Sequence, residues 1–109
     1  EPDNSIVRAR LSPEGEGLQV LVYAPDQNDL FARICGYFDN AGFSILDARI
    51  HTTHTGHALD TFQVVAPTLS DHYRELISMV ESELGRAIAQ AIVAMGVRSY
   101  GVVGNHEAR

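Results

Sequence analysis

The chain contains no lysine, and its eight basic residues are arginines scattered along 109 positions. Against these stand 14 acidic residues, giving a formal net charge of −6. Phosphate binding needs clustered basic side chains, so this charge balance argues against a nucleic-acid surface. No apolar run approaches the roughly 18 residues of a membrane span, and no basic segment leads into an apolar core at the start. We therefore expect contact with neither nucleic acid nor membrane.

Cysteine is almost absent as well, because Cys35 is the only one. A lone thiol cannot form an internal disulfide, and it fits a reducing compartment, so we expect a cytoplasmic protein. Cys35 lies beside the apolar stripe of a predicted helix. We expect it to be an inert small residue of a core or interface.

What is present is typical of a globular domain, with 45% apolar and 20% charged residues. The length suits one domain with a hydrophobic core. Because the first residue is Glu1 and not Met, we expect a piece of a longer protein. The parent's chemistry would then lie outside this piece.

The organising stretch runs from Leu18 to Phe31, LQVLVYAPDQNDLF. Its first half is apolar on both faces except at Gln19, the pattern of a central strand. Before it, residues 6–11 alternate like a half-exposed strand and residues 12–17 have turn chemistry, so a first strand should fold back beside it. After it, a short polar loop leads into a helix.

We place this helix from about Asp29 to Ala41, because apolar side chains recur at helical spacing at Leu30, Ile34, Phe38 and Ala41. Asn28 or Asp26 can cap its start. Gly42 suits the left-handed residue that follows a helix end.

Residues 43–53 and 57–66 form a predicted hairpin around His54-Thr55-Gly56. A second helix should run through Tyr73 to about Ala94. Residues 97–103 are predicted to form a closing strand. The order is then an extra N-terminal strand followed by β-α-β-β-α-β. This predicts an α+β, ferredoxin-like fold, with a four-stranded antiparallel sheet and both helices on one face. The open face of such a sheet commonly meets a partner subunit.

Three motifs in the middle of the chain carry a family resemblance. They are PDxxxLF at 25–31, DARIHTT at 47–53 and GHALDTF at 56–62. Together they resemble an ACT domain, and more narrowly the first of two C-terminal ACT domains in the bacterial PII uridylyltransferase/uridylyl-removing enzymes. The resemblance covers Leu18 to about Val65. It implies that residues 1–17 are an added strand and turn and that 18–104 form the ACT domain.

The resemblance implies a glutamine sensor of nitrogen regulation that tips the parent enzyme between adding and removing uridylyl groups. The nucleotidyltransferase and hydrolase domains, with Mg²⁺ as the parent's metal, would lie upstream, leaving this piece non-catalytic and free of cofactors. Expected partners are glutamine, a second ACT domain or a second copy of the chain, and the PII protein for the parent. The expected ligand site is the loop and first helical turn: Pro25, Asp26, Gln27, Asn28, Asp29, Leu30 and Phe31.

Two departures from the family pattern stand out. Asp29 occupies a position where many ACT domains have glycine, so it adds a charged side chain where backbone often meets ligand. From about Ala91 the chain reads AIVAMGVRSYGVVGNHEAR, where the family usually has a polar, basic linker.

The chemistry of the loop leaves two interpretations open. In the first, the helix N-terminus binds a ligand carboxylate, Asp26 or Asp29 pairs with an ammonium, and Gln27 or Asn28 matches an amide. In the second, Asp26 and Asn28 only cap the helix and Gln27 is solvated. Two functions of the domain stay open in the same way. It is either a module that binds an amino acid or a structural ACT module that mediates pairing without binding a ligand.

Other polar residues carry weaker alternatives. Asp47 and Asp60 resemble an acid/base couple, but no nucleophile accompanies them. We expect pairing with Arg49 or Arg33, or simple exposure. His51, His54 and His57 match no standard metal signature, so surface histidines are favoured over a zinc or nickel site.

Overall fold

A computed structural model describes residues 5–27, 29–67 and 69–108, with only the backbone described for 69–71 and 95–108. In chain order its elements are β1 (Ile6–Leu11), β2 (Leu18–Pro25), α1 (Leu30–Asn40), β3 (Ser44–Thr52), β4 (His57–Val65) and α2 (Leu69–Ala108).

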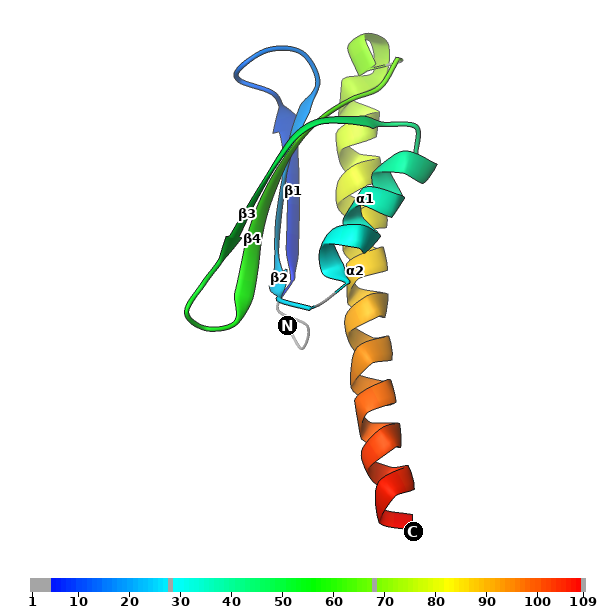
Figure 1. Cartoon of the computed structure of the whole chain (residues 1–109). Coiled ribbons are helices and arrows are strands. Elements are labelled where there is room, and N and C mark those ends of the chain that lie inside the picture. Colours follow the sequence, from blue (N-terminus) through cyan, green and yellow to red (C-terminus); the bar gives the residue numbers. More distant parts are fainter. Residues whose placement is uncertain (1–4, 28, 68, 109) are drawn as a thin grey trace.

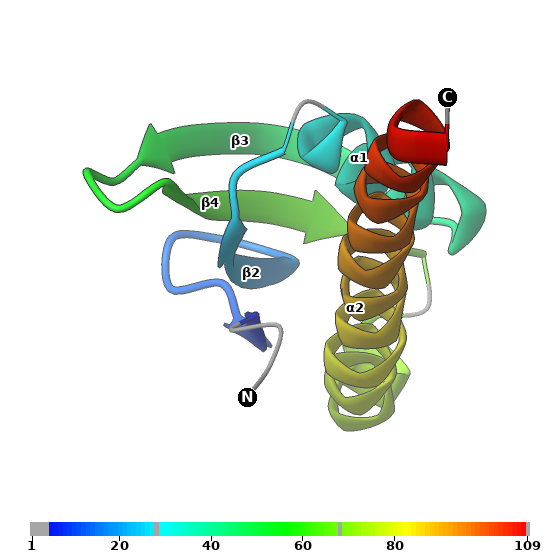
Figure 2. The ribbon, with the colours of Figure 1, turned by 90° about the horizontal axis from the view of Figure 1, so that it is seen from below.

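The four strands form one antiparallel sheet in the order β1-β2-β4-β3. Both helices cover the same face of this sheet, and the other face is free of helices (Figures 1 and 2). α2 lies over β1 and β2, whereas α1 lies nearer β3. The predicted α+β, ferredoxin-like arrangement with an added N-terminal strand is therefore confirmed.

The predicted closing strand over 97–103 is wrong, because α2 continues as a helix to Ala108. β1 occupies the edge position beside β2, with Ile6 opposite Tyr23 and Leu11 opposite Leu18. The sheet thus has its fourth strand before α2 begins. The alanine-rich stretch from Ala87 to Ala94 favours helix and carries it onward. In Figure 1 the last turns of α2 run beyond the end of the sheet.

The core lies between the sheet and the helices. Alternate residues of β2 and β4 face it, and α1 and α2 each add one apolar stripe. Its fully buried large side chains are Leu18, Val20, Val22, Ile34, Phe38, Phe62, Val64, Val80, Leu84 and Ile88. The predicted α1 stripe is confirmed, with Leu30, Ile34 and Phe38 buried and Ala41 packed at its margin.

Two glycines are required by backbone geometry. Gly42 follows α1 with φ +87°, as predicted, and the next amide, that of Phe43, donates to the Phe38 carbonyl at 2.9 Å. Gly17 enters β2 with φ +96°, and a Cβ there would collide with the carbonyl oxygen of Val64. The turn between β1 and β2 therefore packs closely against β4.

Side chains of α2 also secure the outer elements. The backbone N–H of Ala9 in β1 donates to Glu81 Oε2 at 2.9 Å, so a helical carboxylate satisfies an amide of the edge strand. The Tyr37 hydroxyl of α1 donates to Glu83 Oε1 at 3.0 Å.

No helix among the described residues is long and apolar enough to cross a membrane.

Candidate functional site

The predicted ligand loop lies where β2 ends and α1 begins, beside the turn between β3 and β4. Pro25 is the last residue of β2 and pairs with His57. The N–H of Asp26 donates to the Gly56 carbonyl oxygen at 2.9 Å, which fixes the start of the loop to the neighbouring hairpin. The carboxylate of Asp26 is exposed.

The start of α1 differs from the predicted capping. The N-cap residue is Asp29, and its side chain makes no capping hydrogen bond. Its Oδ2 instead pairs with Arg33 Nε at 3.0 Å, one helical turn further on. Asp26 therefore does not take the predicted capping role, and Asn28 lies outside the described residues.

Three buried acceptor oxygens in this region have no hydrogen-bond partner among the described residues. They are Gln27 Oε1, Asp29 Oδ1 and Asp60 Oδ1. A buried polar group without a partner is uncommon in proteins and calls for an explanation. All three are acceptors, so the group that would satisfy them is a donor such as an ammonium or an amide NH₂.

The carboxyl group of Asp60 belongs to β4 and lies below the loop. Asp60 is 2% exposed, and its neighbours two positions away on the same face are Ala58 and Phe62, both in the core. Phe62 stacks against Phe31 in the first turn of α1, with ring centroids 5.9 Å apart. Asp60 therefore lies under the N-terminal end of α1.

The environment of Asp60 disfavours its charge. Burial raises the pKa of its carboxyl group, and the negative charge of Asp26 raises it further. A hydrogen bond with the backbone of His51 lowers this pKa. The ionised form of Asp60 is therefore disfavoured.

Sequence reasoning missed the burial of Asp60, since pairing with Arg49 or Arg33, or simple exposure, was expected for Asp47 and Asp60. Arg33 pairs with Asp29 instead. The missed signal is the alternation in HALDTFQVV, which puts Asp60 on the same strand face as Phe62 and Val64. The other half of that expectation is confirmed, because Asp47 pairs with Arg49 at 3.2 Å.

The remaining loop residues divide between packing and exposure. Leu30 is 2% exposed and belongs to the core, whereas the Phe31 ring is 44% exposed. The loop thus has an apolar ring, a helix N-terminus and a carboxylate oxygen without a hydrogen-bond partner among the described residues. This combination suits a small zwitterion with one anionic and one cationic group.

The other candidate groups are separated in space. Asp47 is opposite Gln63 and Asp60 is opposite Ile50, so the two carboxylates lie on opposite faces of the sheet. His57 stacks on Tyr23 with ring centroids 4.9 Å apart. Among the described residues, no group of three or more His, Cys, Asp or Glu side chains is placed to hold a metal.

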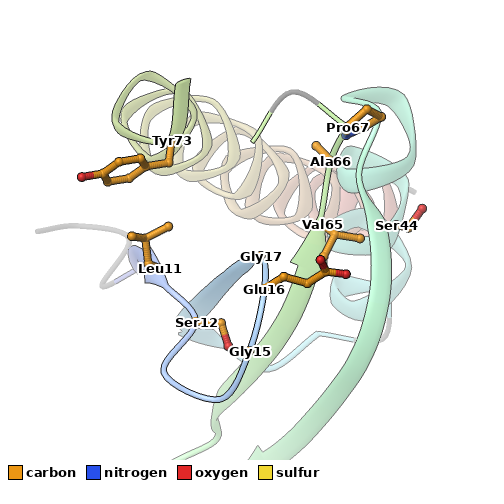
Figure 3. Close-up of a pocket in the computed structure, with 10 residues that line it drawn as sticks. All are labelled: Leu11, Ser12, Gly15, Glu16, Gly17, Ser44, Val65, Ala66, Pro67 and Tyr73. Atoms are coloured by element: carbon orange, nitrogen blue, oxygen red, sulfur yellow. The ribbon is translucent and has the colours of Figure 1, made fainter. Parts of the chain in front are cut away.

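An open cleft of about 800 Å³ lies at the other end of the sheet, away from the predicted loop (Figure 3). Leu11 and Tyr73 flank one side of it, and the β1–β2 turn, the end of β4 and Ser44 at the start of β3 contribute the other lining residues. Its lining residues are Leu11, Ser12, Gly15, Glu16, Gly17, Ser44, Val65, Ala66, Pro67 and Tyr73. Neither the loop residues from Pro25 to Phe31 nor the carboxylates described above line this cleft.

Fold and site together define a small ferredoxin-like domain with a polar strand-to-helix loop over a buried carboxyl group. The chain is 61% identical over 92 residues to the bifunctional uridylyltransferase/uridylyl-removing enzyme of Ralstonia nicotianae, which covers 81% of this chain and 11% of that enzyme. It is 59% identical over 85 residues to the enzyme of the same name from Cupriavidus metallidurans, covering 78% of the chain and 10% of the enzyme. The Thiobacillus denitrificans enzyme, also so named, is 51% identical over 88 residues, covering 80% and 10%.

The chain is thus homologous to a short segment of these bifunctional enzymes and spans about a tenth of their length. No protein-family model matches it. No solved structure matches it either.

Proposed function

We propose that this chain is an ACT domain that binds glutamine and regulates a bifunctional PII uridylyltransferase/uridylyl-removing enzyme. The observation that carries the proposal is the set of buried acceptor oxygens at the start of α1 that have no hydrogen-bond partner among the described residues. The ferredoxin-like fold and the homology to a segment of these enzymes support it. In this proposal the domain itself is non-catalytic, and the transferase and hydrolase chemistry, with its Mg²⁺, belongs to other domains of the parent.

The proposed ligand site comprises the residues from Pro25 to Phe31. The N-terminus of α1 receives the amino acid's carboxylate, because backbone N–H groups and the helix dipole favour an anion there. The acceptors at Gln27 and Asp29 face the donors of the ligand. The exposed ring of Phe31, in the first turn of α1, covers the aliphatic part of the ligand side chain in this proposal.

Calorimetric titration of the chain with L-glutamine tests this function. We expect saturable binding in the millimolar range or tighter, and weaker binding by Asp26→Ala, because that substitution removes a loop carboxylate. Asp47→Ala is the matched control, since Asp47 is an exposed carboxylate on the helix-free face. Absence of binding heat at millimolar glutamine, or equal heats with unrelated amino acids, contradicts the proposal.

A second candidate function is an interaction module that transmits the state of the parent without binding a ligand. Its support is the apolar surface, because Ile6 is 45% and Leu21 36% exposed on the helix-free face of the sheet. A second ACT domain, a second copy of the chain or the PII protein are the proposed partners for this surface.

Regulation of the full-length enzyme separates the two candidates. If the loop binds glutamine, Asp26→Ala blunts the glutamine response of both activities. If the domain only transmits state, that response survives Asp26→Ala, whereas Leu21→Asp on the helix-free face abolishes it.

A further inference from the structure

Asp60 is the only buried polar or charged side chain among the described residues. The described ion pairs are Asp29 with Arg33 and Asp47 with Arg49, and neither includes Asp60. Taking a carboxylate out of water without a counter-charge is costly. A purely structural residue at this position would be better served by a neutral side chain.

The groups around Asp60 increase this cost. Asp26 adds a second negative charge, whereas a hydrogen bond from the backbone of His51 favours the ionised carboxylate. Asp60 Oδ1 has no hydrogen-bond partner among the described residues, and buried acceptors of Gln27 and Asp29 share that condition. Arg33 is engaged by Asp29 Oδ2, so among the described residues these three acceptor oxygens are left without a donor.

We propose that Asp60 is the specificity-determining residue that recognises the ammonium group of the bound amino acid. The inference rests on the proposed function and adds a residue outside the loop. Asp60 supplies a fixed carboxylate from β4, and the helix N-terminus supplies the opposite polarity. Because β4 is a central strand, the position of this carboxylate is set by the rigid part of the fold.

This arrangement explains which amino-acid derivatives the site rejects. A ligand without the ammonium would leave Asp60 Oδ1 buried without a hydrogen-bond partner, and such an atom imposes its desolvation cost. Discrimination by an unpaired buried group exceeds what an apolar pocket achieves. The site should therefore distinguish glutamine from its deaminated analogue, 4-carbamoylbutanoate.

The test compares both ligands on three proteins by calorimetric titration of the whole chain. The proteins are the wild type, Asp60→Asn and the control Asp47→Asn. We expect Asp60→Asn to weaken glutamine binding by about tenfold or more, the range of a charge-assisted hydrogen bond. Asp47→Asn should leave the affinity within about twofold, as for an exposed ion pair.

The deaminated analogue supplies the decisive comparison. It should bind the wild type more weakly than glutamine does, and Asp60→Asn should not weaken it further, because the analogue has no ammonium to lose. Melting curves of Asp60→Asn establish that the variant is folded.

Three outcomes overturn the inference. If the wild type binds glutamine no more tightly than Asp60→Asn does, the proposed function stands but Asp60 is not part of the site. Equal losses of glutamine and of the analogue in Asp60→Asn assign Asp60 to the fold and not to the ammonium. Absence of glutamine binding by the wild type overturns the inference together with the proposed function.

Discussion

The carboxyl group of Asp60 links the stability of the fold to pH. Burial, followed by the charge of Asp26, raises its pKa above the ordinary value of 3.8. The folded chain therefore holds this proton more tightly than the unfolded chain does. Its stabilising contribution is complete below the unfolded pKa and is lost as pH rises through the folded pKa.

We predict that Asp60→Asn stabilises the fold at pH 7, by about 1 kcal/mol or more, because the amide avoids a buried unpaired charge. At a pH below the ordinary value, where Asp60 is protonated in both states, the two proteins should have nearly equal stability. Urea titrations at the two pH values measure the difference. A stability loss in Asp60→Asn that is the same at both values would contradict the prediction.

A residue of this kind is hard to foresee from sequence alone. The apolar stripe of α1 was predictable because its side chains recur at helical spacing, and apolar side chains with that spacing are expected to be buried. Asp60 follows the strand period equally well, but a carboxyl group is expected at the surface. Under the proposed function, Asp60 would serve ligand binding at a cost in stability, as residues of functional sites often do.

At the scale of elements, α1 and α2 are joined by a polar contact at their exposed margin. The Tyr37 hydroxyl donates to Glu83 Oε1 at 3.0 Å. Burial raises the pKa of the Tyr37 hydroxyl, and the hydrogen bond and charge of Glu83 add to the effect. The hydroxyl is therefore protonated, and able to donate, throughout the neutral range.

We predict that Tyr37→Phe lowers the free energy of unfolding by about 0.5–1.5 kcal/mol, the net value of one hydrogen bond. Chemical denaturation of Tyr37→Phe, Glu83→Gln and the double variant measures the coupling between the two side chains. Strictly additive losses would show that the two side chains do not stabilise each other.

The error in the final element has a physical cause. Residues 97–103 contain the β-branched pattern of a strand, and local propensity is a weak guide when tertiary context decides. Two features outweigh it here. After the kink at His72, near the start of α2, the helix-forming residues before Ala94 carry the helix on to Ala108, and β1 already fills the edge beside β2.

At the scale of the whole molecule, β1 determines which edge of the sheet is closed. It pairs with β2 along its length, and Val7 is buried in the core. Without β1, the backbone groups of β2 would form an open edge beside an uncovered patch of core. α2 would also lose the bond between Glu81 and the Ala9 amide.

We predict that deleting residues 1–11 lowers the melting temperature markedly and promotes self-association through β2. Light scattering during size-exclusion chromatography measures the association, with the full chain at equal concentration as the reference. Retention of both the melting temperature and the oligomeric state of the full chain would show that β1 is dispensable.

The position of β1 also has a consequence for folding kinetics. A closing strand at 97–103 would have paired with β2 across most of the chain, and that loop closure is slow. Here β1 and β2 are joined by one short turn, and β3 and β4 form a second local hairpin. Only the pairing of β2 with β4 spans a long separation within the sheet. Refolding should therefore be fast for a four-stranded sheet, with the two hairpins protected from hydrogen exchange before α2 docks.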